Sequence, residues 1–220
     1  MSYGVQVEVW GPYALFSRPE LKAERVSYDV ITPSAARGLI EAIFWHPGLR
    51  YCIDAIHVLK PVRFTSIRRN EVKSKASAKD ALSAMRGGDK PLGIVAPQDI
   101  LQRAAMVLTD VHYVLDAHFE MTERAAPSDN PGKFKDILTR RLEKGQCYHT
   151  PCFGCREFPA SFRAWQGGRI PVPEGCEGRR DLGLMLYDMD YSNPRDIQPL
   201  FFRAVMEEGT IRVAGEEVYR

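Results

Sequence analysis

The N-terminal part of the chain combines two periodic patterns of hydrophobic residues. Valines alternate with other residues over positions 3–10, which predicts a half-buried strand. Apolar residues then recur every three or four positions, which is the spacing of one helical face. Thr32 is a favourable N-cap residue, and the Pro-Gly pair beginning at Pro47 is a typical stop. The sequence therefore predicts a helix over residues 32–47, packed onto a sheet.

The rest of the chain contains further predicted strands and one more helix. Residues 103–120 alternate between apolar and polar side chains, as one or two strands would. Asn130 and Gly145 are typical of the two ends of a helix whose apolar stripe lies between them. Residues 66–100 are polar and Gly-rich, which predicts a long irregular insertion. The other strand-like segments are residues 51–64, 182–187 and 200–205, and residues 147–165 are a short loop followed by strand-like sequence.

The order of these elements indicates the fold class. Strand, helix, strand, strand, helix, strand is the order of a ferredoxin-like, or RRM-like, α+β domain. We expect this domain to span residues 1–165, with the insertion at about 66–100, and a small C-terminal antiparallel β-sheet to span residues 166–220. Sheet faces of RRM-like domains often bind RNA, although the fold alone does not establish that function.

Composition limits the class of protein. The chain has 220 residues, of which 45% are hydrophobic and 26% charged, as in a soluble globular protein. No apolar run is long enough for a membrane helix, and the N-terminus lacks the pattern of a signal peptide. Five cysteines in a chain of this length favour a reducing cytoplasm over a disulfide framework. The net charge of +2 does not by itself indicate a nucleic-acid partner.

The distribution of charge is more informative than its sum. Basic residues flank the start of the predicted insertion and would contact backbone phosphates of RNA; they are Arg68, Arg69, Lys73 and Lys75. A second basic row, which includes Arg140 and Arg141, lies on the outer face of the second helix and is a further candidate for RNA contact. The alternative is that both sets are solvated, with Arg69 paired to Glu71. Trp45 lies off the apolar stripe of the first helix and could stack on a base.

Four possible metal ligands are close together in the C-terminal half, namely Cys147, His149, Cys152 and Cys155. Thiolates and imidazole are the ligands of structural zinc. However, their spacing is tighter than in paired zinc knuckles, and Cys155 lies in a strand-like segment that would point it away. We therefore expect free thiols, with no metal site and no cofactor.

Several motifs together resemble a known family. They are GPYALF (11–16), SYDVITPSA (27–35), GLIEAIFW (38–45), IRRNEV (67–72), HYVLDAHF (112–119) and FGCREF (153–158). In this order they are similar to the type I-C CRISPR-associated protein of Cas family five, subtype d. The resemblance covers almost the whole chain.

The resemblance implies a fold, an activity and partners. It implies a ferredoxin-like domain followed by a small sheet, and a metal-independent endoribonuclease that cleaves the repeat hairpin of precursor CRISPR RNA. The products would be a 2′,3′-cyclic phosphate and a 5′-hydroxyl. The protein would stay on the 5′ handle in the type I-C Cascade complex, against the Cas family seven backbone subunit and the Cas family eight large subunit. DNA is a further candidate ligand.

The resemblance also implies three catalytic positions, and at only one of them does this chain have the residue type of the family. The family uses a tyrosine at the end of the first helix, with a lysine and a histidine on a later strand. The tyrosine position falls on Phe44, the lysine on Asp116 or Ala117, and the histidine on His118. We expect His118 to act in proton transfer, with His46 as a second candidate and the cation supplied by Arg68, Arg69 or Lys73. The alternative is a non-catalytic subunit that caps the 5′ handle.

Overall fold

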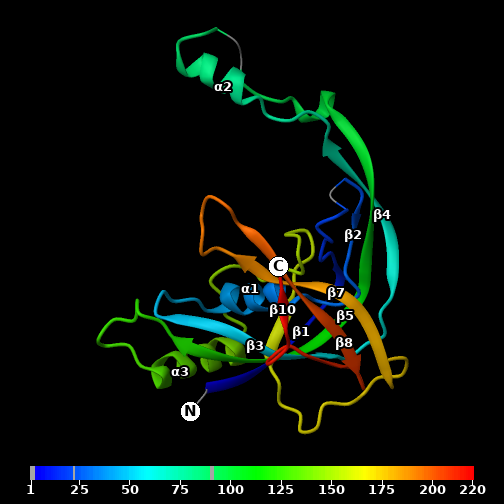
Figure 1. The fold of residues 1–220 in the computed structure, drawn as a ribbon, viewed down its shortest axis with the longest axis vertical. Coiled ribbons are helices and arrows are strands. Elements are labelled where there is room, and N and C mark those ends of the chain that lie inside the picture. The colour runs from blue at the N-terminus through cyan, green and yellow to red at the C-terminus, as the bar shows by residue number, and fades with distance from the viewer. Residues whose placement is uncertain (1–2, 22, 90–91) are drawn as a thin grey trace.

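The longest element of the structure is strand β5 (Ile100–Met121), which runs through the body and out along an arm (Figure 1). The computed structural model describes residues 3–21, 23–89 and 92–220. The other strands are β1 (Tyr3–Ala14), β2 (Arg25–Val26), β3 (Leu49–Val58), β4 (Phe64–Val72), β6 (Ser161–Ala164), β7 (Arg179–Asp190), β8 (Gln198–Glu207), β9 (Thr210–Arg212) and β10 (Val218–Tyr219). The helices are α1 (Pro33–Ile43), α2 (Ala78–Met85), α3 (Pro131–Lys144) and the short 3₁₀ helix η1 (Ala96–Gln98).

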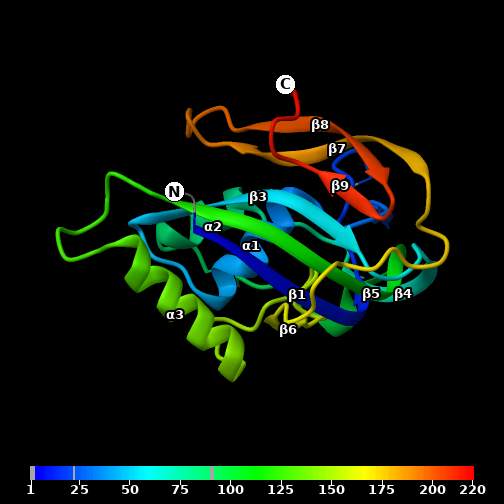
Figure 2. The same cartoon turned by 90° about the horizontal axis from the view of Figure 1, so that it is seen from below.

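The body is an antiparallel sheet covered by helices on one face. Strands β3, β5, β1 and β6 are hydrogen-bonded neighbours in that order. Helices α1 and α3 lie on the same side of these strands (Figure 2). Because side chains alternate along a strand, one face of β1 and β5 supplies buried apolar residues such as Val7, Val9 and Leu115 to the core. The opposite face, which we call the open face, carries polar side chains.

Helix α1 begins as predicted but ends earlier. The Thr32 hydroxyl accepts a hydrogen bond from the Ala35 amide, as an N-cap should. The prediction that the helix continues to Pro47 is wrong, because it ends at Ile43 and Phe44 is extended, with φ −148°. This conformation packs the Phe44 ring on α3, and Arg141 of α3 donates to the Ile43 carbonyl. The contact with α3 thus satisfies a carbonyl that the helix leaves free.

Helix α3 has both predicted ends. The Asn130 side chain accepts a hydrogen bond from the Lys133 amide, 2.9 Å away. Gly145 adopts the left-handed conformation, with φ 63°, that favours glycine after a helix. Phe134, Leu138 and Leu142 form its buried stripe. The two caps and this stripe were readable from sequence because all of them depend on neighbouring residues in the chain.

The C-terminal strands do not form a separate sheet. Strands β7 and β8 pair with each other as predicted, but the short strand β9 pairs with both β8 and β3. The described strands therefore form one continuous hydrogen-bonded sheet. Without β9, part of the outer edge of β3 would expose unpaired backbone groups, which could pair with the strands of another chain. Buried residues of β7 and β8, such as Met185 and Phe202, also belong to the main hydrophobic core.

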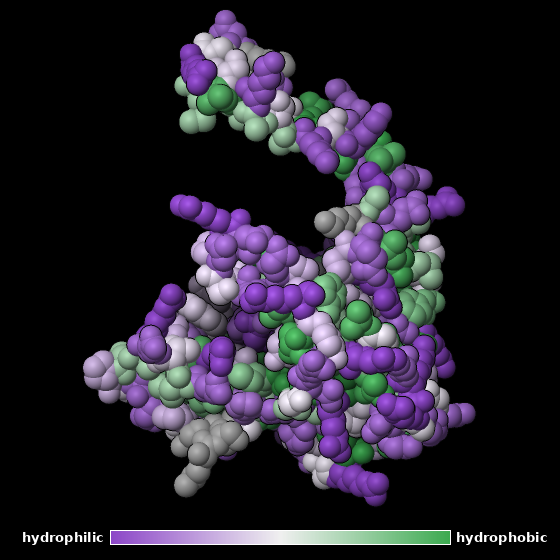
Figure 3. All heavy atoms as spheres, in the orientation of Figure 1, coloured by the Kyte–Doolittle hydropathy of each residue, from purple (hydrophilic) through white to green (hydrophobic). Residues whose placement is uncertain are grey.

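The predicted irregular insertion is largely regular. Strand β4 pairs with the first half of β5, from Phe64 opposite Leu108 to Val72 opposite Ile100. This two-stranded ribbon forms the arm, and helix α2 lies at its tip (Figure 1). An open concavity separates the tip from the body (Figure 3). The sequence did not predict this ribbon because both of its strands are largely exposed to solvent in the arm and therefore lack a clear apolar face. Among the described residues, no helix has the length and hydrophobicity needed to cross a membrane.

Candidate functional site

The open face of the sheet carries three histidine–carboxylate pairs. Nδ1 of His118 lies 2.8 Å from Asp54, and Nε2 of His57 lies 3.0 Å from Asp116. The third pair joins Nε2 of His112 to Glu8 at 2.8 Å. The sequence predicted that His112, Asp116 and His118 share one face of their strand. The structure confirms it, because all three side chains meet partners from β1 or β3 on the open face.

A β-bulge in β3 gives His118 its carboxylate partner. Ile53 pairs with Ala117, and Ala55 pairs with Asp116, so Asp54 is an extra residue with no partner on β5. Bulges of this kind redirect a side chain. Here the bulge places both carboxylate oxygens of Asp54 within 2.9 Å of Nδ1. A carboxylate can only accept, so Nδ1 carries the proton, and Nε2 of the neutral ring has a free lone pair.

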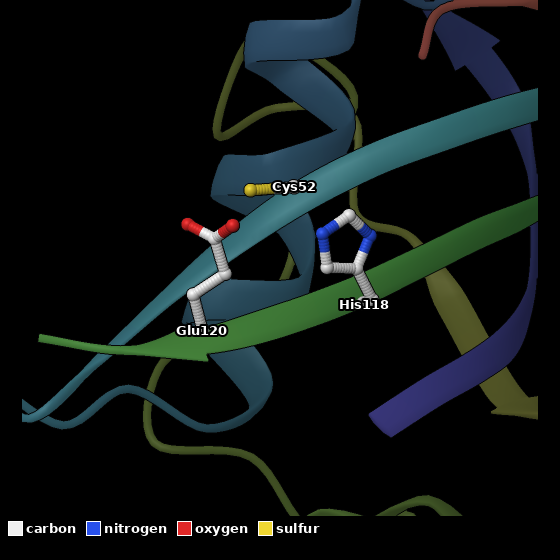
Figure 4. A group of neighbouring side chains, drawn as sticks. All are labelled: Cys52, His118 and Glu120. Carbon is white, nitrogen blue, oxygen red and sulfur yellow. The ribbon is translucent and has the colours of Figure 1, made fainter. Parts of the chain in front are cut away.

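Cys52 and Glu120 lie on the side of His118 to which Nε2 points (Figure 4). Cys52 is directly across from His118 on β3, and Glu120 is two residues farther along β5. Glu120 accepts a hydrogen bond of 2.6 Å from Arg50. On the β1 side, the residue opposite His118 is Gly4, which has no side chain. The imidazole is therefore accessible from the β1 side.

A surface hollow of about 480 Å³ adjoins this position. Gly4, Gln6, Asp54 and Asp116 line it on the sheet side. Trp165, which follows β6, lines its other side together with residues of α3. An aromatic side chain beside polar hydrogen-bonding groups is what a nucleotide base and its sugar could contact. Sequence reasoning did not select Trp165.

Among the described residues of the open face, Glu8 is the most enclosed charged group. Its side chain is only 3% exposed, and it accepts hydrogen bonds from Arg163 and His112. The Arg163 guanidinium also lies over the ring of Trp10. The hydrogen bond from Arg163, aided by His112, holds the pKa of Glu8 below its usual 4.5, although burial raises it. These contacts fasten β6 to β1 across the open face.

We expect Glu8 to make folding stability depend on acid pH. Because the folded protein lowers the pKa of Glu8, its contribution is complete above about pH 4.5 and is lost as the pH falls through the lowered value. Glu8→Gln should therefore be less stable than wild type at neutral pH and approach it in acid. Unfolding in urea between pH 3 and pH 7 measures this, with Glu143→Gln on α3 as control. A constant difference between the Glu8 variant and wild type would contradict the prediction.

His46 does not join His118 in the structure. Its ring stacks on Phe134 of α3, with the ring centroids 4.8 Å apart. Its Nδ1 accepts a hydrogen bond from the Gly48 amide at 3.0 Å and lies 3.8 Å from Asp129. His46 thus lies in the helix layer, whereas His118 is on the open face. Its contacts are those of a residue that fixes a turn.

The aromatic end of α1 also lies in the helix layer. Phe44 is 6% exposed and packs between Phe134 and the guanidinium of Arg141. A residue in this position is separated from His118 by the sheet. Trp45 is 55% exposed and remains available for stacking on a base. Arg141 is occupied by the end of α1, while Arg140 is exposed and has no side-chain partner within the described parts of the chain.

The basic residues of the arm are far from His118 along the same strand. Arg68 pairs with Ala104, which precedes His118 by fourteen residues, or roughly 46 Å of extended strand. Arg68, Lys73 and Lys75 are exposed. The expectation that a cation from this region acts beside His118 is therefore wrong for a single chain. These residues could still contact phosphates elsewhere on an RNA.

Arg69 has the protein partners that the sequence left as an alternative. It pairs with Glu71 at 3.4 Å and with Glu157 at 3.0 Å. Glu71 also lies near Arg25 and Arg103, so these groups form a network where the arm leaves the body. The Arg69 side chain is only 15% exposed. Its contacts indicate a role in holding the arm.

The four cysteine and histidine residues at positions 147–155 do not converge. All the described cysteines are free. Cys147 is exposed, and Cys152 forms a β-bridge with Pro159. In the described parts of the chain, the one group of three or more ligating side chains is Cys52, His118 and Glu120. Among the described residues, no three of these four ligating atoms come together, so the close spacing in sequence did not produce a metal-binding group.

Sequence reasoning missed most of the surroundings of His118. Asp54 depends on a bulge, and Cys52 depends on the register between two strands, so neither is encoded by a local motif. The importance of Gly4 could not be predicted from sequence, because it lies in the absence of a side chain opposite His118. The alternation over β5 could have included Glu120, which follows His118 on the same face.

Comparisons with known proteins define the class of this chain. A family model for Cas5d, described as CRISPR-associated protein (Cas_Cas5), matches residues 4–214. A solved structure titled "Crystal Structure of CRISPR-associated Protein" covers 100% of this chain and 97% of its own, with a TM-score of 0.68 and 22% identity. At that identity the likeness concerns the fold. The class is thus that of a CRISPR-associated protein.

Two curated relatives make the assignment narrower. The protein named CRISPR pre-crRNA endoribonuclease Cas5d of Mannheimia succiniciproducens is 47% identical, over 100% of both chains. The protein of the same name from Thermus thermophilus is 42% identical, over 98% of this chain and 95% of its own. The chain belongs to the Cas5d family, which confirms the resemblance found in its motifs.

Proposed function

We propose that this chain is a pre-crRNA endoribonuclease. Both curated relatives carry that name, at 47% and 42% identity over nearly full length. The observation that carries the proposal is the His118–Asp54 pair, which orients a partly exposed imidazole on the open face of the sheet. The order β3-β5-β1-β6, with α1 and α3 on one face, supports a ferredoxin-like unit over about residues 1–165.

The proposed reaction is attack of a ribose 2′-hydroxyl on the adjacent phosphate. The products are a 2′,3′-cyclic phosphate and a 5′-hydroxyl, and no metal is needed. His118 transfers a proton through Nε2, as base toward the 2′-hydroxyl or as acid toward the leaving 5′-oxygen. Asp54 holds the ring orientation and the tautomer, which makes it a positioning residue. We assign proton transfer to His118 rather than His46, because His46 is committed to a turn in the helix layer.

Stabilisation of the extra negative charge requires a cation near His118. The guanidinium of Arg50 lies on the same face and pairs with Glu120, two residues beyond His118. Arg50 is 65% exposed and can turn toward a bound phosphate. We propose that Arg50 takes the place that the family assigns to a lysine, since Asp116 in that region is bound to His57 and Gln6.

Binding of the RNA would extend beyond the site of cleavage. We propose that the hollow beside Trp165 holds nucleotides next to the scissile bond. Exposed basic residues would contact the RNA backbone farther away, with Trp45 as a stacking residue; they are Arg68, Lys73, Lys75 and Arg140. The proposed partners are the repeat hairpin and, in a cytoplasmic Cascade complex, the Cas family seven and Cas family eight subunits. DNA remains a candidate ligand.

One observation favours a second function. Phe44 lacks the hydroxyl of the tyrosine that the family is expected to use, and it is buried on the far side of the sheet from His118. A chain without efficient catalysis would instead bind the 5′ handle as a structural subunit. Both functions require RNA binding, and they differ only in whether the RNA is cut.

Incubation of the purified protein with labelled repeat RNA in EDTA tests the proposal. We expect a single cut that yields a cyclic phosphate, because His118 and Arg50 supply proton transfer and charge without a metal. Replacing the 2′-hydroxyl at the cut position with hydrogen should abolish cleavage and leave binding nearly unchanged. Tight binding of the unmodified repeat without any cut would reject the enzyme and favour the structural subunit.

A further inference from the structure

We propose that Cys52, His118 and Glu120 form a binding site for a thiophilic divalent metal ion, with zinc(II) as the expected ion. One ligating atom from each residue lies within 4.8 Å of the others (Figure 4). Ligands about 2.0 to 2.3 Å from a shared ion are themselves about 3.3 to 3.8 Å apart, so a small contraction completes the site. The site is distinct from the clustered cysteines at positions 147–155.

The chemistry of the donors selects the type of ion. A thiolate, an imidazole nitrogen and a carboxylate oxygen are a combination typical of zinc. Magnesium and calcium prefer oxygen ligands and would gain little from Cys52. Three protein ligands leave a fourth position for water, and Glu120, with 51% of its side chain exposed, places the group next to solvent. The arrangement therefore matches the coordination of an accessible zinc ion with a bound water molecule.

Asp54 prepares the imidazole for this role. Metal-binding histidines usually donate their other N–H group to a carboxylate, which fixes the tautomer and the direction of the ring. The Asp54 carboxylate accepts from Nδ1 of His118 at 2.8 Å, and Nε2 points toward Cys52 and Glu120 (Figure 4). The bulge in β3 thus supplies the outer partner of the site, and β3 and β5 supply the ligands.

Arg50 competes with the metal only in part. It donates one hydrogen bond to Oε2 of Glu120, and the pair is largely exposed, with 65% and 51% of the two side chains accessible. Exposed ion pairs contribute little to stability. The second oxygen of Glu120 can bind a metal while Arg50 stays on the first. Binding also displaces the thiol proton of Cys52, so it should strengthen with pH.

The site has a consequence for RNA cleavage that rests on the proposed function. The metal occupies Nε2, the nitrogen that would transfer a proton to or from the RNA. Zinc should therefore inhibit cleavage rather than support it. Cys52 would thus allow a metal ion to inhibit a cleavage reaction that itself requires no metal.

Cobalt(II) provides a direct test, because its thiolate complexes absorb in the near ultraviolet. We expect the full-length protein, freed of metal by a chelator, to bind one cobalt ion per chain with a thiolate charge-transfer band, and zinc to remove that band. Cys52→Ser should lose it, while Cys147→Ser, at an exposed position, should keep it. Far-ultraviolet circular dichroism checks the fold of both variants. Absence of the band in the wild type, or its persistence in Cys52→Ser, would overturn the proposal.

A second measurement links the metal to cleavage. The rate with zinc is divided by the rate in EDTA for each protein. We expect zinc to slow the wild type at least tenfold and to have a much smaller effect on Cys52→Ser. An equal effect on both would remove the regulatory role. Because cobalt binding is measured without RNA, a protein that never cleaves RNA would still report on the metal site.

Discussion

His118→Ala should slow cleavage of repeat RNA by about 10²- to 10⁴-fold, the usual contribution of general acid–base catalysis. The lost imidazole is held in place by Asp54 and is 24% exposed on the open face. Binding should change little, because most of the affinity for RNA comes from phosphate contacts elsewhere. Single-turnover cleavage in EDTA and a parallel binding titration measure the two effects separately.

The control for this prediction is His149→Ala. His149 is exposed and packs against Tyr148, so its loss should leave the rate near that of the wild type. Asp54→Asn tests the positioning role: an amide can donate to Nδ1, and the ring would then present an N–H group at Nε2. We expect a slower rate and an altered pH–rate profile with unchanged RNA binding. Cleavage by His118→Ala at the wild-type rate would remove His118 from the mechanism.

Phe134→Ala should lower the free energy of unfolding by about 3 to 5 kcal/mol, as expected when a buried phenylalanine is truncated. Phe134 is 1% exposed, and the rings of Phe44 and His46 both pack against it. Its removal would leave a cavity where the end of α1 meets α3. Denaturant unfolding monitored by circular dichroism measures the loss.

Two other variants delimit this effect. Phe134→Leu keeps most of the volume and should cost clearly less than Phe134→Ala. Ile137→Ala, on the same helix at a half-buried position, should also cost less. A loss below about 1 kcal/mol for Phe134→Ala would mean that the junction of α1 and α3 contributes little to stability. That result would also mean that the contact between His46 and Phe134 does little to stabilise the fold.

Several features of this protein were decided locally and could be predicted from sequence. The caps of α3 and the N-cap of α1 depend on residues within one helical turn. The shared face of His112, Asp116 and His118 follows from the alternation of side chains along a strand. The family assignment was likewise carried by short motifs in a fixed order, because their residues identify relatives without reference to their contacts.

The remaining features required the tertiary structure, because they depend on contacts between distant segments. The early end of α1 depends on Phe44 and Arg141 meeting α3, and the continuous sheet depends on β9 reaching β3. The surroundings of His118 depend on strand register and a bulge, which bring Asp54 and Cys52 across from another strand. Sequence alone determined that His118 lies on a polar strand face. Only the pairing of β3 with β5 decided which groups surround it, because one residue of register shift moves a side chain to the other face.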